Sequence, residues 1–340
     1  MYSKRRLPAE WEPQSCIQFT FPHRDSDWAD TYEAALDCFV NCITIVSQFE
    51  QVSVVCNNAI ETQSYLNHIP ASDIQFVEIP SNDTWARDHG GISIWENEKA
   101  VILDFQFNAW GLKFAADQDN LITQRLHQKG IFQHTELRTL GFVLEGGSIE
   151  SDGQGTLFTT TNCLLSPNRN PHLDQHEIEQ YLIDIFGLKR VLWLDHGYLE
   201  GDDTDAHIDT LARFCSPDTI AYVQCNDPKD IHYEALKKME AQLRTFRTLE
   251  GKPYQLIPLP LPDAIFDDEG NRLPATYANF LFVNGGIIVP TYDCAQDNEV
   301  LGLFRQIFPE RKVVGVDCRR LIIQHGSLHC ITMQYPRKDV

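Results

Sequence analysis

The chain has 340 residues, and its 48 Asp and Glu against 28 Lys and Arg give a formal net charge of −20 at pH 7. So acidic a balance does not suit a phosphate-neutralising surface, and we therefore expect no nucleic-acid partner. Hydrophobic residues make up 43% of the chain, enough for an ordered core, but no apolar run reaches the ~18 residues of a membrane span. The start of the chain lacks the apolar stretch of an export signal, so we expect a cytoplasmic protein without membrane partners.

Five segments have helical periodicity, and short runs rich in Val, Ile and Phe between them have the composition of strands. In chain order, the predicted elements are helix 28–49, strand 52–56, strand 101–107, helix 117–128, strand 156–160, helix 174–186, strand 220–225, helix 231–247, strand 286–290 and helix 296–308. Helices that alternate with strand pairs indicate an α/β fold. No Pro/Ser/Gly-rich linker or charge run divides the chain, so we expect a single domain over 1–340.

Two helix exits nearly repeat each other in sequence. The segments 185–195 and 307–317 share Ile-Phe, two spacers, two cations, a β-rich run and a final Asp, and they lie 122 residues apart. This offset fits a repeat unit of about 60 residues, with the pair two units apart. Four glycine turns, at 89–91, 145–147, 284–286 and 325–327, each precede a strand-like run. The repetition predicts a radial architecture.

Ten cysteines are scattered singly along the chain without a CxxC pair, which excludes a zinc ribbon and a thioredoxin motif. In a reducing compartment most are expected to pack as small hydrophobic residues. Packing is also the default for Cys330, which opens an apolar run, although a free thiolate there could serve as a nucleophile. The nearby His325 and His329 are four residues apart, but an intervening glycine argues against the helix that would join them at a zinc ion.

The densest polar cluster is Gly-Asp-Asp-Thr-Asp-Ala-His-Ile-Asp at 201–209. If this segment were extended, alternation would align four side chains on one face, namely Asp203, Asp205, His207 and Asp209. A calcium-binding EF-hand is excluded, because its required Gly and Glu positions hold Ile and Phe here. A transition-metal site and a solvated acidic loop around Asp202 and Asp203 stay open, but the apolar residues after His207 predict that the segment runs into the core.

Charged residues also precede two of the glycine turns. Trp85-Ala-Arg-Asp88 sets a carboxylate beside an indole, a pair that can hold a cation by charge and by cation–π attraction. A structural pair between Arg87 and Asp88 is an equal alternative. Glu145 follows an apolar run, so its carboxylate is expected to be buried with a partner, unless it caps its own turn.

Taken together, these segments resemble the agmatine deiminases of the guanidino-group-modifying, or pentein, superfamily. The matching motifs are Leu-Pro-Ala-Glu-Trp-Glu-Pro at 7–13, Trp-Ala-Arg-Asp at 85–88, Leu-Glu-Gly-Gly at 144–147, Pro-Asn-Arg-Asn-Pro at 167–171, the cluster at 201–209, Ala-Asn at 278–279 and His-Cys-Ile-Thr at 329–332. They cover nearly the whole chain in the family's order. The resemblance implies a five-bladed, pseudo-symmetric α/β propeller (the pentein fold) of ββαβ units around a central site, in agreement with the repeat.

The resemblance also implies a reaction and the residues that carry it out. The implied roles are Cys330 as nucleophile, His207 as general acid and base, Glu145 as the residue that orients it, Asp88 and Asp209 as the carboxylates that grip the guanidinium, and Trp85 beside them in the substrate site. The reaction is hydrolysis of agmatine to N-carbamoylputrescine and ammonia through a covalent thiouronium intermediate, a step of polyamine (putrescine) biosynthesis. The implied enzyme is a hydrolase of C–N bonds in linear amidines that needs no metal and no other cofactor.

The chain departs from the family's pattern beside the implied catalytic residues rather than at them. The loop that often reads Trp-Met-Arg-Asp-Thr-Gly-Pro has Ala86, His89 and Gly91 here, and the usual Gly before His207 is Ala206. Alternatives of the same fold are a peptidyl-arginine or free-arginine deiminase and an amidinotransferase. A non-catalytic guanidinium-binding protein and a structural metal-binding protein also stay open. The net charge favours a dicationic small guanidine as partner, and a homo-oligomer is left open.

Overall fold

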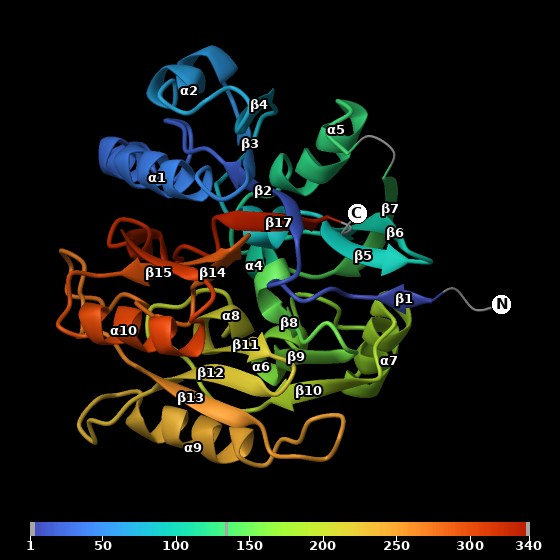
Figure 1. The fold of residues 1–340 in the computed structure, drawn as a ribbon, viewed down its shortest axis with the longest axis vertical. Coiled ribbons are helices and arrows are strands. Elements are labelled where there is room, and N and C mark those ends of the chain that lie inside the picture. Colours follow the sequence, from blue (N-terminus) through green and yellow to red (C-terminus); the bar gives the residue numbers. More distant parts are fainter. Residues whose placement is uncertain (1–3, 133–134, 338–340) are drawn as a thin grey trace.

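The structure, a computed structural model, describes residues 4–132 and 135–337. In these ranges the strands form five small sheets around a common centre, with the longer helices on the outside (Figure 1). Each sheet contains the same unit of three strands. The first strand pairs antiparallel with the second, the second pairs parallel with the third, and a helical connection joins the second strand to the third. Five ββαβ units around a centre make the five-bladed α/β propeller that the sequence predicts.

Four of the units follow one another along the chain. The first consists of β5 (Ile92–Glu96), β6 (Lys99–Gln106), α5 (Ile122–Gln128) and β7 (Glu136–Val143), with β1 (Arg5–Arg6) at its edge. The second consists of β8 (Ile149–Ser151), β9 (Thr156–Thr160), α7 (Gln175–Phe186) and β10 (Arg190–Leu194). The third consists of β11 (Ala212–Ser216), β12 (Thr219–Gln224), α9 (Tyr233–Leu243) and β13 (Gln255–Pro260). The fourth consists of β14 (Leu281–Val283), β15 (Gly286–Thr291), α10 (Asp297–Ile307) and β16 (Lys312–Asp317).

The fifth unit joins the two ends of the described chain. It consists of β17 (Thr332–Pro336), β2 (Gln14–Thr20), α1 (Tyr32–Val46), β3 (Gln51–Cys56), α2 (Ala59–Tyr65) and β4 (Ile74–Glu78). β17 pairs antiparallel with β2, so that Thr332 lies opposite Phe19, whereas β2, β3 and β4 run parallel. The ring is therefore closed by hydrogen bonds between the last strand and an early one, and Cys330 lies just before that closing strand.

The five predicted helices are present as α1, α5, α7, α9 and α10, each shorter than its predicted range at one or both ends. α7 has the expected signals at both ends. Asp174 accepts a hydrogen bond from the backbone N–H of Glu177, Glu177 accepts one from that of Asp174, and Gly187 ends the helix with φ of 70°. Its buried face is Ile178, Leu182 and Phe186, at the i, i+4, i+8 spacing of one side of a helix.

The repeated helix exits lie in the second and fourth units, as α7–β10 and α10–β16, and are therefore two units apart as predicted. Three of the four glycine turns lead directly into β5, β8 and β15. The turn at 325–327 does not, because β17 begins only at Thr332, and the residues between include Cys330.

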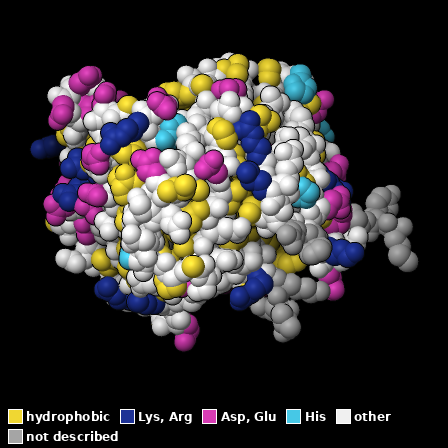
Figure 2. Space-filling view, turned by 90° about the horizontal axis from the view of Figure 1, so that it is seen from above, with side chains coloured by type: hydrophobic (Ala, Val, Ile, Leu, Met, Phe, Trp, Pro, Cys, Tyr) yellow, Lys and Arg dark blue, Asp and Glu magenta, His cyan; other side chains and the backbone are white. Residues whose placement is uncertain are grey.

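Buried apolar side chains form two clusters that draw on several units. In the described ranges, no helix combines the length and the apolar composition needed to cross a membrane. On the face shown in Figure 2, Lys and Arg side chains are interspersed with Asp and Glu instead of forming one basic patch.

Candidate active site

Each unit places a polar or nucleophilic side chain near the centre, shortly before its first strand. These residues are Asp88 in α3 (Ala86–His89) before β5, Glu145 ahead of the 3-10 turn Gly146–Ser148 and β8, His207 and Asp209 at α8 (Ile208–Leu211) before β11, Asn279 before β14, and Cys330 before β17. All six are buried, with at most 4% of any one exposed. The fivefold repeat therefore gathers these five predicted site residues, together with Asn279, for which no role was predicted from the sequence.

Gly147 shows how closely three of these side chains converge. A Cβ atom on Gly147 would lie 2.6 Å from His207 Nδ1, 2.8 Å from Asp88 Oδ1 and 3.1 Å from Asp209 Oδ2. The first two distances are shorter than real side chains allow, so this glycine is required for close approach rather than for an unusual φ. The imidazole and both carboxylates therefore surround one point of the backbone.

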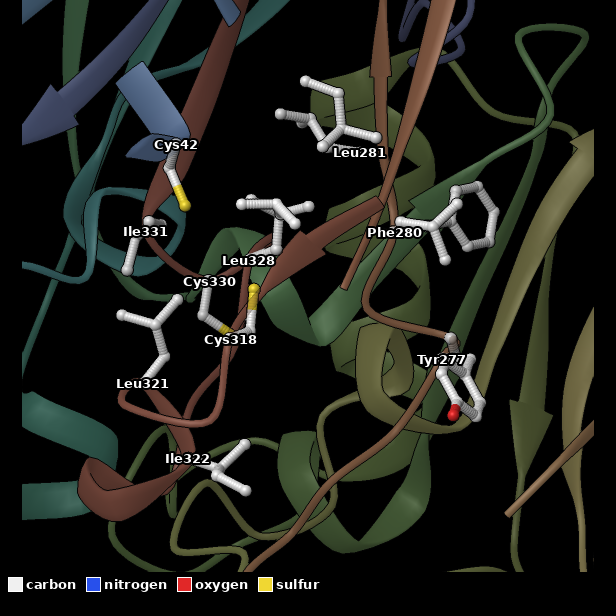
Figure 3. Close-up of a cluster of buried hydrophobic side chains, with 14 of the residues drawn as sticks. Cys42, Tyr277, Phe280, Leu281, Cys318, Leu321, Ile322, Leu328, Cys330 and Ile331 are labelled. Atoms are coloured by element: carbon white, nitrogen blue, oxygen red, sulfur yellow. The ribbon is translucent and has the colours of Figure 1, made fainter. Parts of the chain in front are cut away.

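Cys330 lies between these groups and the apolar core. Figure 3 shows it among buried side chains that include Leu328 and Ile331. Its Sγ is 3.9 Å from Asp209 Oδ2, and the side-chain amide of Asn279 donates to it at 3.4 Å. Burial raises the pKa of the Cys330 thiol well above its ordinary value, and the two nearby aspartates raise it further. These effects favour the thiol form.

Asp88 is held by two donors. Trp110 Nε1 donates to Oδ2 at 2.9 Å, and the backbone N–H of Gly147 donates to Oδ1 at 3.0 Å. Burial raises the pKa of this carboxyl to about 6, although the neighbouring His207 acts in the opposite direction. Arg87 does not pair with Asp88 but donates to Gln334 Oε1 at 2.6 Å, so the structural pair considered from the sequence is absent.

His207 Nδ1 lies 3.6 Å from Asp88 Oδ1, and the imidazole also interacts with the side chain of Cys163. Burial lowers the pKa of His207, but Asp88, Cys163 and Glu145 outweigh burial and raise it well above the ordinary value. A protonated imidazole is the form suited to give a proton to a leaving group. Cys163, which contributes to this shift, carries no signal in the sequence that distinguishes it from the other scattered cysteines.

Glu145 is buried with a partner, as expected, and the partner is Arg169. Arg169 Nε lies 3.0 Å from both carboxylate oxygens of Glu145. Its other nitrogens reach Asp205 Oδ2 at 2.6 Å and the carbonyl of Thr204 at 2.9 Å. Arg169, from the matched segment at 167–171, thus ties Glu145 to the loop that carries His207.

The segment 201–209 is not extended, so the condition for aligning its four side chains on one face is not met. Asp205 and Ala206 have φ of 66° and 64°, in the left-handed region, so the alternate residues do not share one face. Asp202, expected to be solvated, is half-buried and accepts hydrogen bonds from the backbone N–H groups of Thr204, at 3.3 Å, and Ala206, at 2.7 Å. These hydrogen bonds favour the turn over the extended form.

Two groups of buried side chains have the composition of metal ligands. They are Glu145 with Cys163 and His207, and Glu10 with Glu150 and His329. In each group an arginine already pairs with the carboxylates: Arg169 with Glu145, and Arg213 with Glu10 and Glu150. Neither group therefore offers a metal ion a free set of carboxylate oxygens.

A pocket of about 360 Å³, partly open to solvent, leads to Cys330 and Asp88. Its other lining residues are Asp27, Asp83, Trp85, Trp110, Phe114, Asp203, Thr204, Gln324, His325 and Gly326. Asp27 and Phe114 are exposed and mark the mouth, whereas Cys330 and Asp88 are buried at the inner end. Four of the lining residues are aspartates and none is Lys or Arg, so the pocket suits a cation.

Trp85, predicted to lie in the substrate site, is one wall of this pocket. Its Nε1 donates to Asp83 Oδ2 at 3.1 Å, which fixes the ring. A Cβ atom on Gly326 would overlap the Trp85 ring, so the glycine lets the chain pass against the indole.

Comparison with known proteins connects this geometry to one family. A sequence profile of the Porphyromonas-type peptidyl-arginine deiminases matches residues 6–336. An agmatine deiminase of Pseudomonas aeruginosa is 34% identical, over 97% of this chain and 95% of that protein. A structure of C. jejuni agmatine deiminase, a Cys-to-Ser variant with substrate bound, has a TM-score of 0.93 and 38% identity over 98% of this chain and 97% of that one.

A third relative is a Porphyromonas gingivalis protein provisionally described as an arginine deiminase, with a TM-score of 0.93 and 49% identity over 98% of this chain and 99% of that one. The matches span the whole ring of units, including the segments that meet at the centre. The chain belongs to the Porphyromonas-type peptidyl-arginine deiminase family.

Proposed function

We propose that the protein is an agmatine deiminase, which hydrolyses agmatine to N-carbamoylputrescine and ammonia. The observation that carries the proposal is the pocket, which leads past four aspartates, with no Lys or Arg in its lining, to a buried cysteine. Agmatine is a dication, with a guanidinium at one end and a primary amine at the other. The curated relative and the substrate-bound structure, both described as agmatine deiminases, support this substrate.

The far end of the pocket separates agmatine from arginine. Asp27, Asp83 and Asp203 lie there, and the described residues that line the pocket include no Lys or Arg to receive the α-carboxylate of arginine. Burial raises the pKa of Asp83 to about 6, so it is largely ionised at pH 7. These aspartates bind the amine of agmatine by charge and hydrogen bonds.

At the inner end, Asp88 and Asp209 grip the guanidinium. The carbon of this group is a poor electrophile because its charge is delocalised, so two carboxylates must hold it in register with Cys330 Sγ. The bound cation also offsets the two aspartates that raise the pKa of the Cys330 thiol, and thereby favours the reactive thiolate.

The reaction then proceeds in two halves. The thiolate adds to the guanidinium carbon, His207 gives its proton to the departing amino group, and ammonia leaves a thiouronium on Cys330. Neutral His207 next takes one proton from water, and the hydroxide adds to the thiouronium carbon. The C–S bond then breaks, the hydroxyl proton passes to the departing sulfur, and N-carbamoylputrescine leaves Cys330 as the thiol. Glu145 acts on His207 through its charge and, through Arg169, by holding the loop on which His207 stands.

Substrate profiling tests the proposal. Ammonia release is measured in parallel from agmatine, free arginine and a peptidyl-arginine, the substrate class in the family's description. We expect turnover of agmatine at a kcat/KM at least ~100-fold above that of the other two. Faster release from arginine or from the peptide would overturn the assignment in favour of that substrate.

A second assay isolates the amine end. Asp203→Asn is compared with the unchanged protein on agmatine and on butylguanidine, which lacks the amine. We expect kcat/KM for agmatine to fall about tenfold, as for loss of one charged hydrogen bond, while butylguanidine is unaffected. Equal losses on both substrates would place Asp203 elsewhere in the mechanism.

A further inference from the structure

Asp209, one of the two carboxylates that grip the guanidinium, has one oxygen anchored and one free. Its Oδ2 lies 2.7 Å from His329 Nδ1, whereas Oδ1 has no hydrogen-bond partner among the described residues. Asp209 and His329 are 0% and 1% exposed. Because a buried carboxylate oxygen without a partner is unfavourable, Oδ1 is the acceptor that an incoming guanidinium can satisfy.

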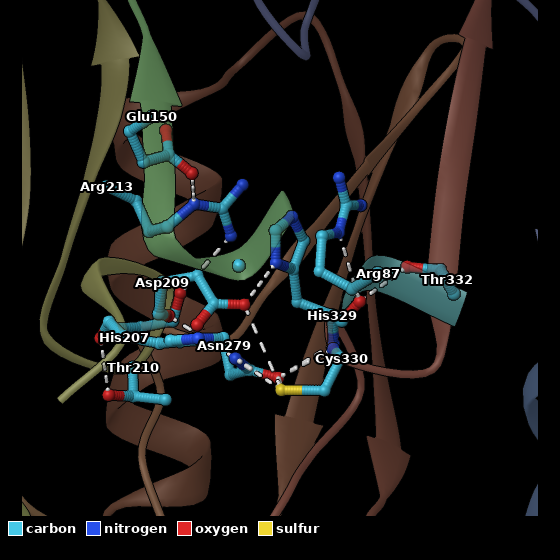
Figure 4. A network of polar contacts seen from close by, with 12 residues as sticks. Arg87, Glu150, His207, Asp209, Thr210, Arg213, Asn279, His329, Cys330 and Thr332 are labelled. Carbon is cyan, nitrogen blue, oxygen red and sulfur yellow. Dashed lines mark hydrogen bonds and ion pairs between the residues drawn. The ribbon is translucent and has the colours of Figure 1, made fainter. Parts of the chain in front are cut away.

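His329 is held on its other edge by Glu10. Its Nε2 lies 2.6 Å from Glu10 Oε2, so the ring stands between two carboxylates that come from distant parts of the chain. Figure 4 shows the ring between Asp209 and the guanidinium groups of Arg213 and Arg87. The Glu10–His329–Asp209 chain is thus a continuous series of hydrogen bonds from the far side of the centre to the substrate site.

Glu10 is itself fixed. It accepts a hydrogen bond from Arg213 Nη2 at 2.6 Å and one from the backbone N–H of Phe282 at 2.9 Å. Arg213 is also paired with Glu150, and its Nη1 donates to the carbonyl of Phe280 at 2.6 Å. The outer end of the chain of hydrogen bonds is therefore anchored to the third and fourth units.

The surrounding charges keep both carboxylates ionised. Burial raises the pKa of Glu10, but Arg213 and His329 outweigh it and hold the pKa well below the ordinary value. For Asp209, the hydrogen bond and charge of His329 likewise overcome burial and lower the pKa. Because a neutral imidazole has only one N–H, contacts of 2.7 Å and 2.6 Å to two ionised carboxylates require the protonated form of His329. If the ring turned away from Asp209, this buried carboxylate would lose its hydrogen bond from the imidazole, whereas Glu10 would keep its ion pair with Arg213.

We infer that His329 and Glu10 are positioning residues for the reaction, because they fix the orientation and charge of Asp209 so that its free oxygen meets the guanidinium. The inference rests on the proposed function for the identity of the ligand. It also gives a role to the segment 7–13. This segment matches a motif of the family but had no predicted function, and it places Glu10 at the centre.

Two substitutions separate positioning from packing. In His329→Asn the amide N–H takes the place of Nδ1 and can still donate to Asp209, whereas in His329→Gln it takes the place of Nε2 and reaches Glu10 instead. Agmatine binding is measured by calorimetry in proteins that also carry Cys330→Ala, and turnover by ammonia release with Cys330 intact. We expect His329→Gln to weaken binding and lower kcat/KM about 100-fold, and His329→Asn at most about tenfold.

The matched control is His232→Asn. It alters another buried His–Asp contact, of 2.7 Å to Asp230, outside the substrate pocket, and is expected to leave binding and turnover unchanged. Equal losses in the two His329 variants, or binding unchanged in both, would contradict the inference. If the His329 variants do not fold, Glu10→Gln decides: binding about tenfold weaker supports the inference, and unchanged binding overturns it.

The guanidinium ion separates this inference from the proposed function. If the Cys330→Ala protein does not bind agmatine, the proposed function is contradicted. Titration of the same proteins with guanidinium chloride still measures whether Asp209 binds a guanidinium group. Binding of this ion to the parent and its loss in His329→Gln support positioning. Equal binding in both contradicts it.

Discussion

At the scale of single residues, the surroundings of Cys330 disfavour its thiolate, and a bound cation is expected to favour it. Burial and two aspartates raise the pKa of the Cys330 thiol well above its ordinary value of 9.0. We therefore predict that iodoacetamide alkylates Cys330 slowly at pH 7, with a rate that rises up to and beyond pH 9. Peptide mass spectrometry measures this rate apart from that of the other cysteines. Asp209→Asn removes one of the charges and is expected to move the profile to lower pH, whereas full thiolate reactivity at pH 7 in the unsubstituted protein would contradict the account.

A second residue-scale prediction concerns pH. Asp88, with a pKa raised to about 6 by burial, must be ionised to grip the guanidinium, so protonation below pH 6 removes the grip. We predict that the Kd of agmatine for the Cys330→Ala protein rises about tenfold for each pH unit below 6 and is nearly flat from 7 to 8. Calorimetry over this range measures it. The pKa of Asp83 is also raised to about 6, so Asp83 titrates in the same range. The control is therefore Asp88→Asn added to Cys330→Ala, which is expected to make the Kd depend less steeply on pH. No change between pH 5 and 7 would exclude this role for Asp88.

At the scale of elements, the short helix α4 (Ala109–Leu112) is left-handed. Its four residues have φ between 52° and 88°, a conformation that costs roughly 1–2 kcal/mol for each L-residue. Asn108 accepts a hydrogen bond from the backbone N–H of Gly111 and so helps to hold the turn. The left-handed turn places Trp110 so that its Nε1 donates to Asp88. The strained backbone therefore lies beside the substrate site.

This element predicts the effect of Trp110→Phe. Phenylalanine keeps an aromatic wall but removes the N–H that donates to Asp88, a hydrogen bond to a charged group that contributes ~1.5–3 kcal/mol. We expect kcat/KM for agmatine to fall by about 10- to 100-fold, measured by steady-state ammonia release. Trp95→Phe, in β5 and outside the pocket, is the control. Equal activity of the two variants would remove Trp110 from substrate binding.

Elements of different length were not equally predictable. The helices α7 and α10 have enough turns for apolar periodicity, and α7 has a capping box, so the sequence predicts them. The four-residue helices α3, α4, α6 (Thr161–Leu164) and α8 are too short for any periodicity, and partners distant in sequence help to set them. The turn at 201–209 was missed for a related reason, since Asp202 offers its carboxylate to backbone N–H groups that an extended strand would expose.

At the scale of the whole molecule, the repeat explains why motifs spread over the chain meet at one point. Asp88, Glu145, Asp209 and Cys330 meet at the centre because each stands shortly before the first strand of a unit, whereas the roles proposed for them come from the family resemblance. Their supporting partners were not predictable in the same way. The ion pair of Arg169 with Glu145 depends on how neighbouring units are packed, and no spacing within one segment encodes it.

Metal independence is a prediction of the same scale. The two ligand-like groups in the described chain are already paired with arginines, and Arg169 bonds both oxygens of Glu145. We predict that saturating EDTA leaves ammonia release from agmatine unchanged. Activity that EDTA abolishes and one divalent ion restores would show that a metal takes part.

The central claim is that Cys330 attacks the guanidinium of agmatine, and ammonia release from agmatine by the unsubstituted and Cys330→Ser proteins tests it most directly. A serine hydroxyl is a far weaker nucleophile than a thiolate, so we predict a loss of at least ~10³-fold in kcat, with agmatine binding retained in calorimetry. A folded Cys330→Ser protein that releases ammonia at a rate close to that of the unsubstituted protein would contradict the account.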